Sequence, residues 1–109
     1  MPRGQIQIVS AADIKRWVEA GDVVLIDVRE VNEHAAESIP GALNLPLSSF
    51  HPSQLPAVSE GKKLVFHCRS GVRCGTAAEQ AMLQGYQGGD IFRLDGGIFG
   101  WKAAGGATV

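Results

Sequence analysis

With 109 residues, the chain is predicted to form one domain, residues 1–109, which is large enough to bury a core without disulfides or metals. The formal net charge is −1, and the sequence has no basic block with interleaved aromatic residues, which argues against a nucleic-acid partner. The longest apolar runs have only the length of a strand, so we expect no membrane span.

The first part of the chain is predicted to contain a strand, a helix and a second strand. Residues 6–9 form a short apolar run that predicts a strand. Ser10 followed by Asp13 resembles a capping box that opens a helix, and Gly21 closes this helix. Residues 23–28 are apolar on both faces, which is typical of a central parallel strand covered by helices.

The middle of the chain is more polar, and its predicted elements are shorter. Residues 29–38 predict a short helix that ends at the turn signal Ile39-Pro40-Gly41. Residues 42–45 predict another short strand. Residues 48–60 contain two prolines and predict a loop with one helical turn.

The last part of the chain again alternates strands with helices. Residues 64–68 are a short apolar run that predicts a buried strand. Residues 76–84 are rich in strong helix formers, and Gly85 closes that helix. Residues 90–94 predict the last strand, and residues 96–97 lead into a short helix. This alternation indicates an α/β domain with a mostly parallel sheet.

The segment Cys68-Arg69-Ser70-Gly71-Val72-Arg73 is the most informative stretch of the sequence. It begins at the carboxyl end of a strand, where open α/β sheets place their ligands, and it leads into a helix. Backbone N–H groups, the helix dipole and the charges of Arg69 and Arg73 would together stabilise a Cys68 thiolate. The dipole alone contributes at most ~2 kcal/mol, roughly one and a half pKa units, so a reactive thiol needs all three effects. The alternative is a buried structural cysteine, which does not call for an arginine-rich loop.

Four motifs in this order resemble the rhodanese family of sulfurtransferases. They are residues 25–30, residues 39–42 with 44–47, residues 68–73, and Gly96-Gly97 with Trp101. The resemblance implies a rhodanese-like three-layer α/β fold, in which helices flank a five-stranded, mostly parallel sheet. It also implies a stand-alone, single-domain sulfurtransferase whose cysteine carries sulfur as a persulfide.

The resemblance assigns the chemistry to Cys68. It implies that the Cys68 thiolate takes the outer sulfur of a small anionic donor such as thiosulfate, and passes it to cyanide or a thiol. Arg69 and Arg73 would bind the oxygens of the donor, although solvated surface charge is their alternative role. The groups that would hold the persulfide are the backbone N–H groups of Ser70, Gly71, Val72 and Arg73. A second possible function is a carrier that delivers the sulfur to a thioredoxin-like or other acceptor protein, and neither function calls for a cofactor.

Cys74 raises two further questions. Cysteine phosphatases need an arginine after five intervening residues, and Cys74 occupies that position, so phosphatase or arsenate reductase activity is a minor hypothesis. Cys74 could also be a resolving thiol that traps oxidised Cys68 as a disulfide. We favour a packing role, because a loop curled around the Cys68 sulfur would point Cys74 away from it.

Several polar residues are expected to support the fold. Asp27 and Arg29 match an Asp-x-Arg element of the family, and we expect structural hydrogen bonds there rather than catalysis. His67 alternates away from the cysteine along its strand and is expected to be a satisfied polar residue. His34 and His51 lack partners at metal-ligand spacing, so no metal site is expected.

Two departures from the family precede the turn signal at residue 39. Glu37 and Ser38 stand where the family often has glycine and histidine, and they could alter the surface that a partner meets. At the other end of the sequence, residues 104–109 are expected to fray.

The N-terminus and the cysteine content indicate the compartment. Residues 1–5 contain no apolar region of a signal peptide. Two cysteines are fewer than a small secreted disulfide scaffold would carry. We therefore expect a reducing compartment, the cytoplasm.

Overall fold

The computed structural model describes residues 4–58, 61–86 and 88–109 of the chain. Its helices and strands are β1 (Ile6–Val9), α1 (Ala11–Ala20), β2 (Val23–Asp27), α2 (Val31–Ala36), β3 (Leu43–Asn44), β4 (Lys63–His67), α3 (Val72–Leu83), β5 (Ile91–Leu94) and α4 (Gly97–Ala103). Across the described residues the five strands form one sheet in the order β1-β5-β4-β2-β3, and each neighbouring pair is parallel. The predicted α/β fold is therefore confirmed.

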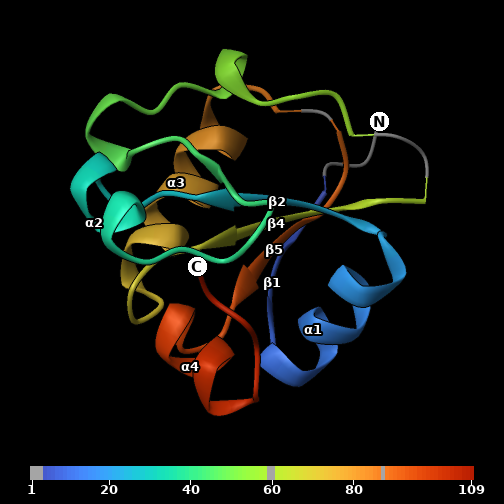
Figure 1. Cartoon of the computed structure of the whole chain (residues 1–109). Coiled ribbons are helices and arrows are strands. Elements are labelled where there is room, and N and C mark those ends of the chain that lie inside the picture. The colour runs from blue at the N-terminus through green and yellow to red at the C-terminus, as the bar shows by residue number, and fades with distance from the viewer. Residues whose placement is uncertain (1–3, 59–60, 87) are drawn as a thin grey trace.

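Helices cover both faces of the sheet (Figure 1). The helices α1 and α4 lie on one face, and α3 lies on the other. In the central strand β4, Leu64 and Phe66 belong to the core under α3, whereas Val65 belongs to the core under α1 and α4. Because both of its faces are covered, β4 is an almost continuous apolar run.

Local sequence signals decide where α1 begins and ends. The Ser10 side chain accepts a hydrogen bond from the Asp13 N–H at 3.2 Å. Asp13 itself pairs with Arg16, so only the Ser10 half of the predicted capping box forms. Gly21 ends the helix at a φ of 75°, a left-handed conformation that glycine adopts without steric cost.

The start of α3 differs from the prediction. The helix begins at Val72 and not at residue 76, because Gly71 adopts a φ of 111° and turns the chain directly into the helix. The loop after β4 is therefore short. As a consequence, the unpaired N–H groups of the first helical turn lie beside Cys68.

Two other predicted segments differ in extent. The helix expected over residues 29–38 is limited to α2, and the loop over 48–60 contains two 3-10 turns, Leu47–Ser49 and Pro52–Gln54. Residues 59–60 of that loop lie outside the described residues. None of the described helices combines the length and the apolar character that crossing a membrane requires.

The expectation of a frayed tail over residues 104–109 is wrong. Ser38 and Val109 exchange two backbone hydrogen bonds of 3.0 and 2.9 Å. The Thr108 hydroxyl donates to the Glu37 carboxylate at 2.8 Å, and the Trp101 indole N–H donates to the Ala107 carbonyl at 2.7 Å. These bonds offset the conformational entropy that would otherwise release the tail, and they involve both residues that depart from the family pattern.

Candidate active site

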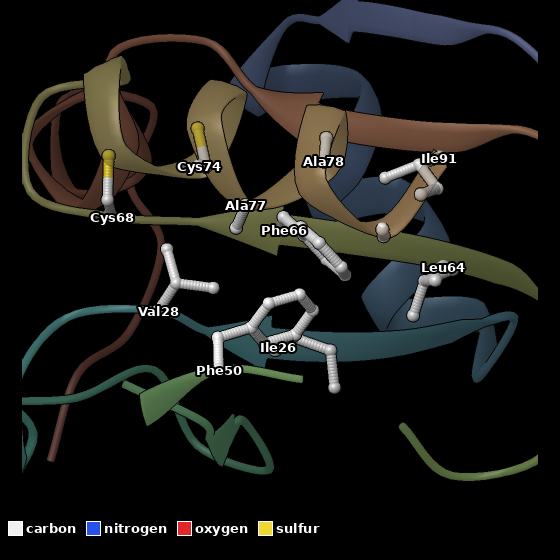
Figure 2. Packing of buried hydrophobic residues seen from close by; sticks show 11 residues of the cluster. Ile26, Val28, Phe50, Leu64, Phe66, Cys68, Cys74, Ala77, Ala78 and Ile91 are labelled. Atoms are coloured by element: carbon white, nitrogen blue, oxygen red, sulfur yellow. The ribbon is translucent and has the colours of Figure 1, made fainter. Parts of the chain in front are cut away.

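Cys68 directly follows β4 at the carboxyl end of the sheet. Its side chain is only 1% exposed. Figure 2 shows Cys68 beside the start of α3, with its sulfur and that of Cys74 on the α3 side of β4. The sulfur therefore lies between the carboxyl end of the central strand and the N-terminus of a helix, a position that favours an anion.

Hydrogen-bond donors surround the Cys68 sulfur. The Gly71 N–H donates to Sγ at 3.0 Å. The pKa of Cys68 falls to about 5, because a hydrogen bond from the Cys74 thiol and backbone N–H groups of Cys74, Gly71 and Ser70 outweigh the effect of burial. At neutral pH Cys68 is therefore a thiolate, which is the nucleophilic form.

Cys74 lies close to Cys68, contrary to the expectation that the loop would point it away. The reason is the early start of α3, which puts Cys74 in the first helical turn over the sulfur. Its sulfur also lies 3.3 Å from the Gly71 carbonyl oxygen, which competes with Cys68 for the single thiol proton. The pKa of Cys74 rises strongly, first because of its hydrogen bond with Cys68 and then because of burial. Cys74 is therefore a protonated donor at neutral pH and a poor nucleophile.

The two arginines of the loop have different surroundings. Arg73 forms a bidentate ion pair with Glu33 of α2, with N–O distances of 2.6 and 2.8 Å. The pKa of Arg73 is raised, first by this hydrogen bonding and also by the charge of Cys68. Arg69 is exposed, and its guanidinium lies 5.1 Å from the centre of the Phe99 ring.

Arg69 also borders a hollow of about 320 Å³ beside the loop. The residues that line it are Arg29, Glu33, Ala36, Glu37, Arg69, Ile98 and Phe99. The backbone connects this hollow to the cysteine, because the Ile98 N–H donates to the Cys68 carbonyl at 2.8 Å.

Asp27 and Arg29 form a buried ion pair below the hollow. The Arg29 side chain donates to both carboxylate oxygens of Asp27, at 2.8 Å from Nη2 and 3.0 Å from Nε. Although burial opposes it, the pKa of Asp27 is lowered by Arg29 and by two histidines. The Arg29 Nη2 also donates to the Glu37 carbonyl at 2.6 Å, and the expected hydrogen bonds of this pair are therefore present.

Two histidines lie near Asp27. His34 Nδ1 lies 2.8 Å from Asp27 Oδ2. His67 is fully buried, and its Nδ1 lies 3.3 Å from the Cys68 carbonyl oxygen. Among the described residues its Nε2 has no hydrogen-bond partner, so only one of its two ring nitrogens is satisfied as expected. Burial lowers the pKa of His67 and keeps it neutral.

The motifs and their geometry agree with a known family. The model of the rhodanese-like domain matches residues 10–104 of the chain. The chain belongs to the rhodanese-like domain family. Its resemblance to rhodaneses, inferred above from four motifs, is thus confirmed.

Relatives of this rhodanese-like domain occur in bacteria, archaea and yeast. An uncharacterized protein of Synechocystis is 47% identical over 80% of the chain, and the chain spans only 47% of that protein's length. The thiosulfate:glutathione sulfurtransferase of Saccharomyces cerevisiae is 34% identical, with coverage of 93% of this chain and 81% of the yeast protein. A rhodanese-related protein of Thermoplasma volcanium is 28% identical and superposes with a TM-score of 0.77, covering 94% of this chain and 97% of the other.

The rhodanese-like domain contains a half-buried charge near the loop that the sequence analysis overlooked. Arg93 of β5 donates from Nη2 to the Gly71 carbonyl at 2.7 Å. The available signal was a charged residue inside an otherwise apolar strand, Ile91-Phe92-Arg93-Leu94. Among the described residues, no group of three or more His, Cys, Asp or Glu side chains is arranged to hold a metal ion.

Proposed function

We propose that this rhodanese-like domain is a sulfurtransferase that moves sulfane sulfur from a donor such as thiosulfate to a thiol or cyanide, through a persulfide on Cys68. The observation that carries the proposal is the Cys68 thiolate, which has a pKa of about 5 and a ring of hydrogen-bond donors at the sheet edge. The yeast relative, named a thiosulfate:glutathione sulfurtransferase, supports both the reaction class and an anionic donor.

The first step is a substitution at sulfur. The Cys68 thiolate attacks the outer sulfur of thiosulfate, and the S–S bond of thiosulfate breaks. Sulfite leaves with the electron pair, and Cys68 carries a persulfide. Because the thiol is already ionised at neutral pH, this step needs no general base.

The persulfide has a terminal sulfur that is itself anionic. The backbone N–H groups of Ser70, Gly71 and Cys74, which stabilise the thiolate, are suited to hold this second sulfur as an oxyanion hole holds oxygen. Arg69 is exposed beside the loop and is our candidate for the oxygens of the donor. Arg73 would contribute mainly through its charge, because both terminal nitrogens of its guanidinium already donate to Glu33.

In the second step a nucleophile removes the outer sulfur. A thiolate or cyanide attacks the terminal sulfur of the persulfide, the S–S bond breaks, and Cys68 leaves as a thiolate again. A reducing compartment such as the cytoplasm would supply thiol acceptors, and Cys68 and Cys74 are both free cysteines.

Phosphatase or arsenate reductase activity is disfavoured by the same residues. Cys74 stands where those enzymes need an arginine that wraps the oxygens of the substrate. Arg73, one position earlier, is paired with Glu33. The site therefore offers a cradle for one sulfur and lacks an arginine placed to wrap the oxygens of a phosphate or arsenate held at the Cys68 sulfur.

A protein acceptor is a second candidate, and exposed apolar residues near the site favour it. Val72, the first residue of α3, is 73% exposed, and Phe99 beside Arg69 is 51% exposed. Exposed apolar side chains around a reactive group are typical of a surface that another protein covers. The thiol that accepts the sulfur would then belong to that protein.

Mass spectrometry and steady-state kinetics test the proposal together. Incubation with thiosulfate should add one sulfur atom to the protein, and cyanide should remove it. The Cys68→Ser protein should gain none, and sulfur that stays cyanide-labile in this variant would contradict the assignment. Rates with cyanide, glutathione and reduced thioredoxin then separate the two candidates, because a protein acceptor should give a far lower KM than a small thiol.

A further inference from the structure

Arg93 is a half-buried charge in an otherwise apolar strand of the sheet. It lies on β5, between β1 and β4, and its register partners are Ile8 and Phe66. Within the described residues no carboxylate lies within 4.0 Å of its guanidinium. Arg93 is half-buried and its Nε is fully buried, so part of the guanidinium has lost its hydration and an anionic group nearby would stabilise its charge.

The Arg93 guanidinium reaches the turn that holds Cys68. Its Nη2 donates to the Gly71 carbonyl at 2.7 Å, and the Cys74 sulfur lies 3.3 Å from the same oxygen. The N–H of Gly71 donates to the Cys68 sulfur at 3.0 Å. Gly71 therefore connects Arg93 to the nucleophile, because its carbonyl accepts a hydrogen bond from Arg93 and its N–H donates one to the Cys68 sulfur.

Gly75 provides the space for this guanidinium. A Cβ atom on Gly75 would lie 2.7 Å from both Cζ and Nη2 of Arg93, closer than atoms can approach. The absence of a side chain at Gly75 thus lets the guanidinium lie under the first turns of α3, next to Cys74. The remaining Nε of Arg93 is buried and has no hydrogen-bond partner among the described residues.

We infer that Arg93 is a positioning residue of the Cys68 site, which holds the Gly71 turn in place and puts a positive charge behind the anionic sulfur. The inference deepens the proposed function, because both the thiolate and the persulfide would be the anions that Arg93 balances. Arg93 acts through Gly71 and Cys74 and need not touch the substrate.

The test uses Cys68 alkylation, which measures the thiolate without any sulfur transfer. The rate of reaction with iodoacetamide is measured as a function of pH, and peptide masses locate the label on Cys68. The alkylation midpoint is the pH at which the rate reaches half of its maximum. Removing the charge in Arg93→Met should raise the alkylation midpoint by about one pH unit. Arg93→Lys keeps a positive charge and hydrogen-bond donors, so its alkylation midpoint should lie close to the wild-type value. Arg16→Met, which removes an exposed arginine on α1, is the control and should leave the midpoint unchanged.

A second variant displaces the guanidinium without removing it. Gly75→Ala favours the helix by intrinsic propensity, but its methyl group pushes the Arg93 guanidinium away. The alkylation midpoint of Gly75→Ala should rise, as that of Arg93→Met does. Thr76→Ala, a change at the neighbouring exposed position, should leave the midpoint at its wild-type value. This variant also keeps the test decisive if Arg93→Met fails to fold.

Folded Arg93→Met or Gly75→Ala proteins with a wild-type alkylation midpoint would overturn the inference. Failure of the proposed function has a different signature: Cys68 would keep its low alkylation midpoint in the wild type, yet gain no cyanide-labile sulfur from any donor. A shifted midpoint in the variants, together with a matching fall in kcat/KM for thiosulfate, supports both.

Discussion

The two layers that cover the sheet are built from side chains of different size. On one face, α3 packs through buried small residues, which are Gly75, Ala77, Ala78 and Ala81. On the other face, α1 and α4 pack through large ones, which include Ile14, Ile98 and Trp101. Small side chains let α3 lie close to the strands, and Figure 2 shows Ala77 between the helix and β4.

This difference separates chemistry from stability. Close packing of α3 brings its first turn, with the N–H of Cys74 and the turn at Gly71, onto the Cys68 sulfur. The α1 and α4 layer supplies an apolar core, and its bond to the cysteine runs from the Ile98 N–H to the Cys68 carbonyl, whereas the donors to the sulfur described above come from α3 and the turn before it. Damage to the first layer should therefore change the thiolate, whereas damage to the second should lower the free energy of unfolding and leave the thiolate intact.

The largest expected effect comes from Ile14→Ala in the α1 layer. Ile14 is fully buried, and its truncation should cost about 2 to 5 kcal/mol of unfolding free energy, because it leaves a cavity. Urea unfolding measures the loss. The alkylation midpoint of Cys68 should stay at its wild-type value, since Ile14 lies on the opposite face of the sheet.

The matched variant in the other layer is Ala77→Leu. Overpacking below α3 should cost about 1 to 3 kcal/mol and move the helix away from the strands. It should therefore also raise the alkylation midpoint of Cys68. If Ala77→Leu left the thiolate unchanged, or Ile14→Ala altered it, the two layers would not be separate in function.

The next effect concerns the arginines of the loop. Arg69→Ala should lower kcat/KM for thiosulfate by about one to two orders of magnitude, mainly through KM, because it removes a charge-assisted contact. Arg73→Ala should lower kcat/KM as well. It should also remove the ion pair with Glu33 that links α3 to α2. Arg69→Lys is the control that keeps the charge. Unchanged kinetics in both alanine variants would leave these arginines as surface charges.

Cys74→Ala probes the thiol donor. Without the Cys74 thiol the pKa of Cys68 should rise by about one unit, because this hydrogen bond is the largest stabilising contribution. Sulfur transfer should fall only a few-fold above pH 7, where Cys68 remains ionised, and more steeply at pH 5. Cys74→Ser retains a donor and should lie closer to wild type.

Mild peroxide separates this donor role from a resolving role. Burial, the second cause of the raised Cys74 pKa, persists after Cys68 is oxidised, so a non-reducing peptide map of the oxidised wild type should contain no Cys68–Cys74 disulfide. A disulfide as the main product, with faster irreversible inactivation of Cys74→Ala, would instead identify Cys74 as a resolving thiol.

The smallest expected effect is the pH dependence of the bridge between α2 and α3. The hydrogen bond from Arg73 lowers the pKa of Glu33 from its usual 4.5 to about 2. A lowered carboxyl pKa stabilises the fold fully above pH 4.5, and this contribution is lost as the pH falls toward about 2. Glu33→Gln should cost about 1 kcal/mol at pH 7 and nothing at the acid end, as measured by urea unfolding at both pH values.

Glu19→Gln is the control for the pH dependence of Glu33→Gln. Glu19 forms an exposed pair with Lys15 on α1 at 3.6 Å, so its replacement should change little at either pH. A Glu33→Gln deficit that did not depend on pH would show that the carboxylate acts through packing and not through its charge.

Sequence alone was sufficient for the alternating strands and helices and for the family, and it predicts the nucleophile. These features depend on near neighbours in the chain: an apolar run that ends on Cys68, a glycine turn at Gly71, and helix formers that follow. Periodicity and turn chemistry report the burial and direction of a segment, so β1, α1 and β2 were placed within one or two residues.

Tertiary structure alone decided which side chains meet around the sulfur. The partner of Arg73 is Glu33, 40 residues away, and the guanidinium below Gly71 comes from Arg93 on another strand. The tail likewise docks on Ser38. These contacts depend on the strand order β1-β5-β4-β2-β3, which brings together segments that are distant in the chain. Local patterns carry no signal for that order, because hydrophobic periodicity says which face of a strand is buried but not which strand lies beside it.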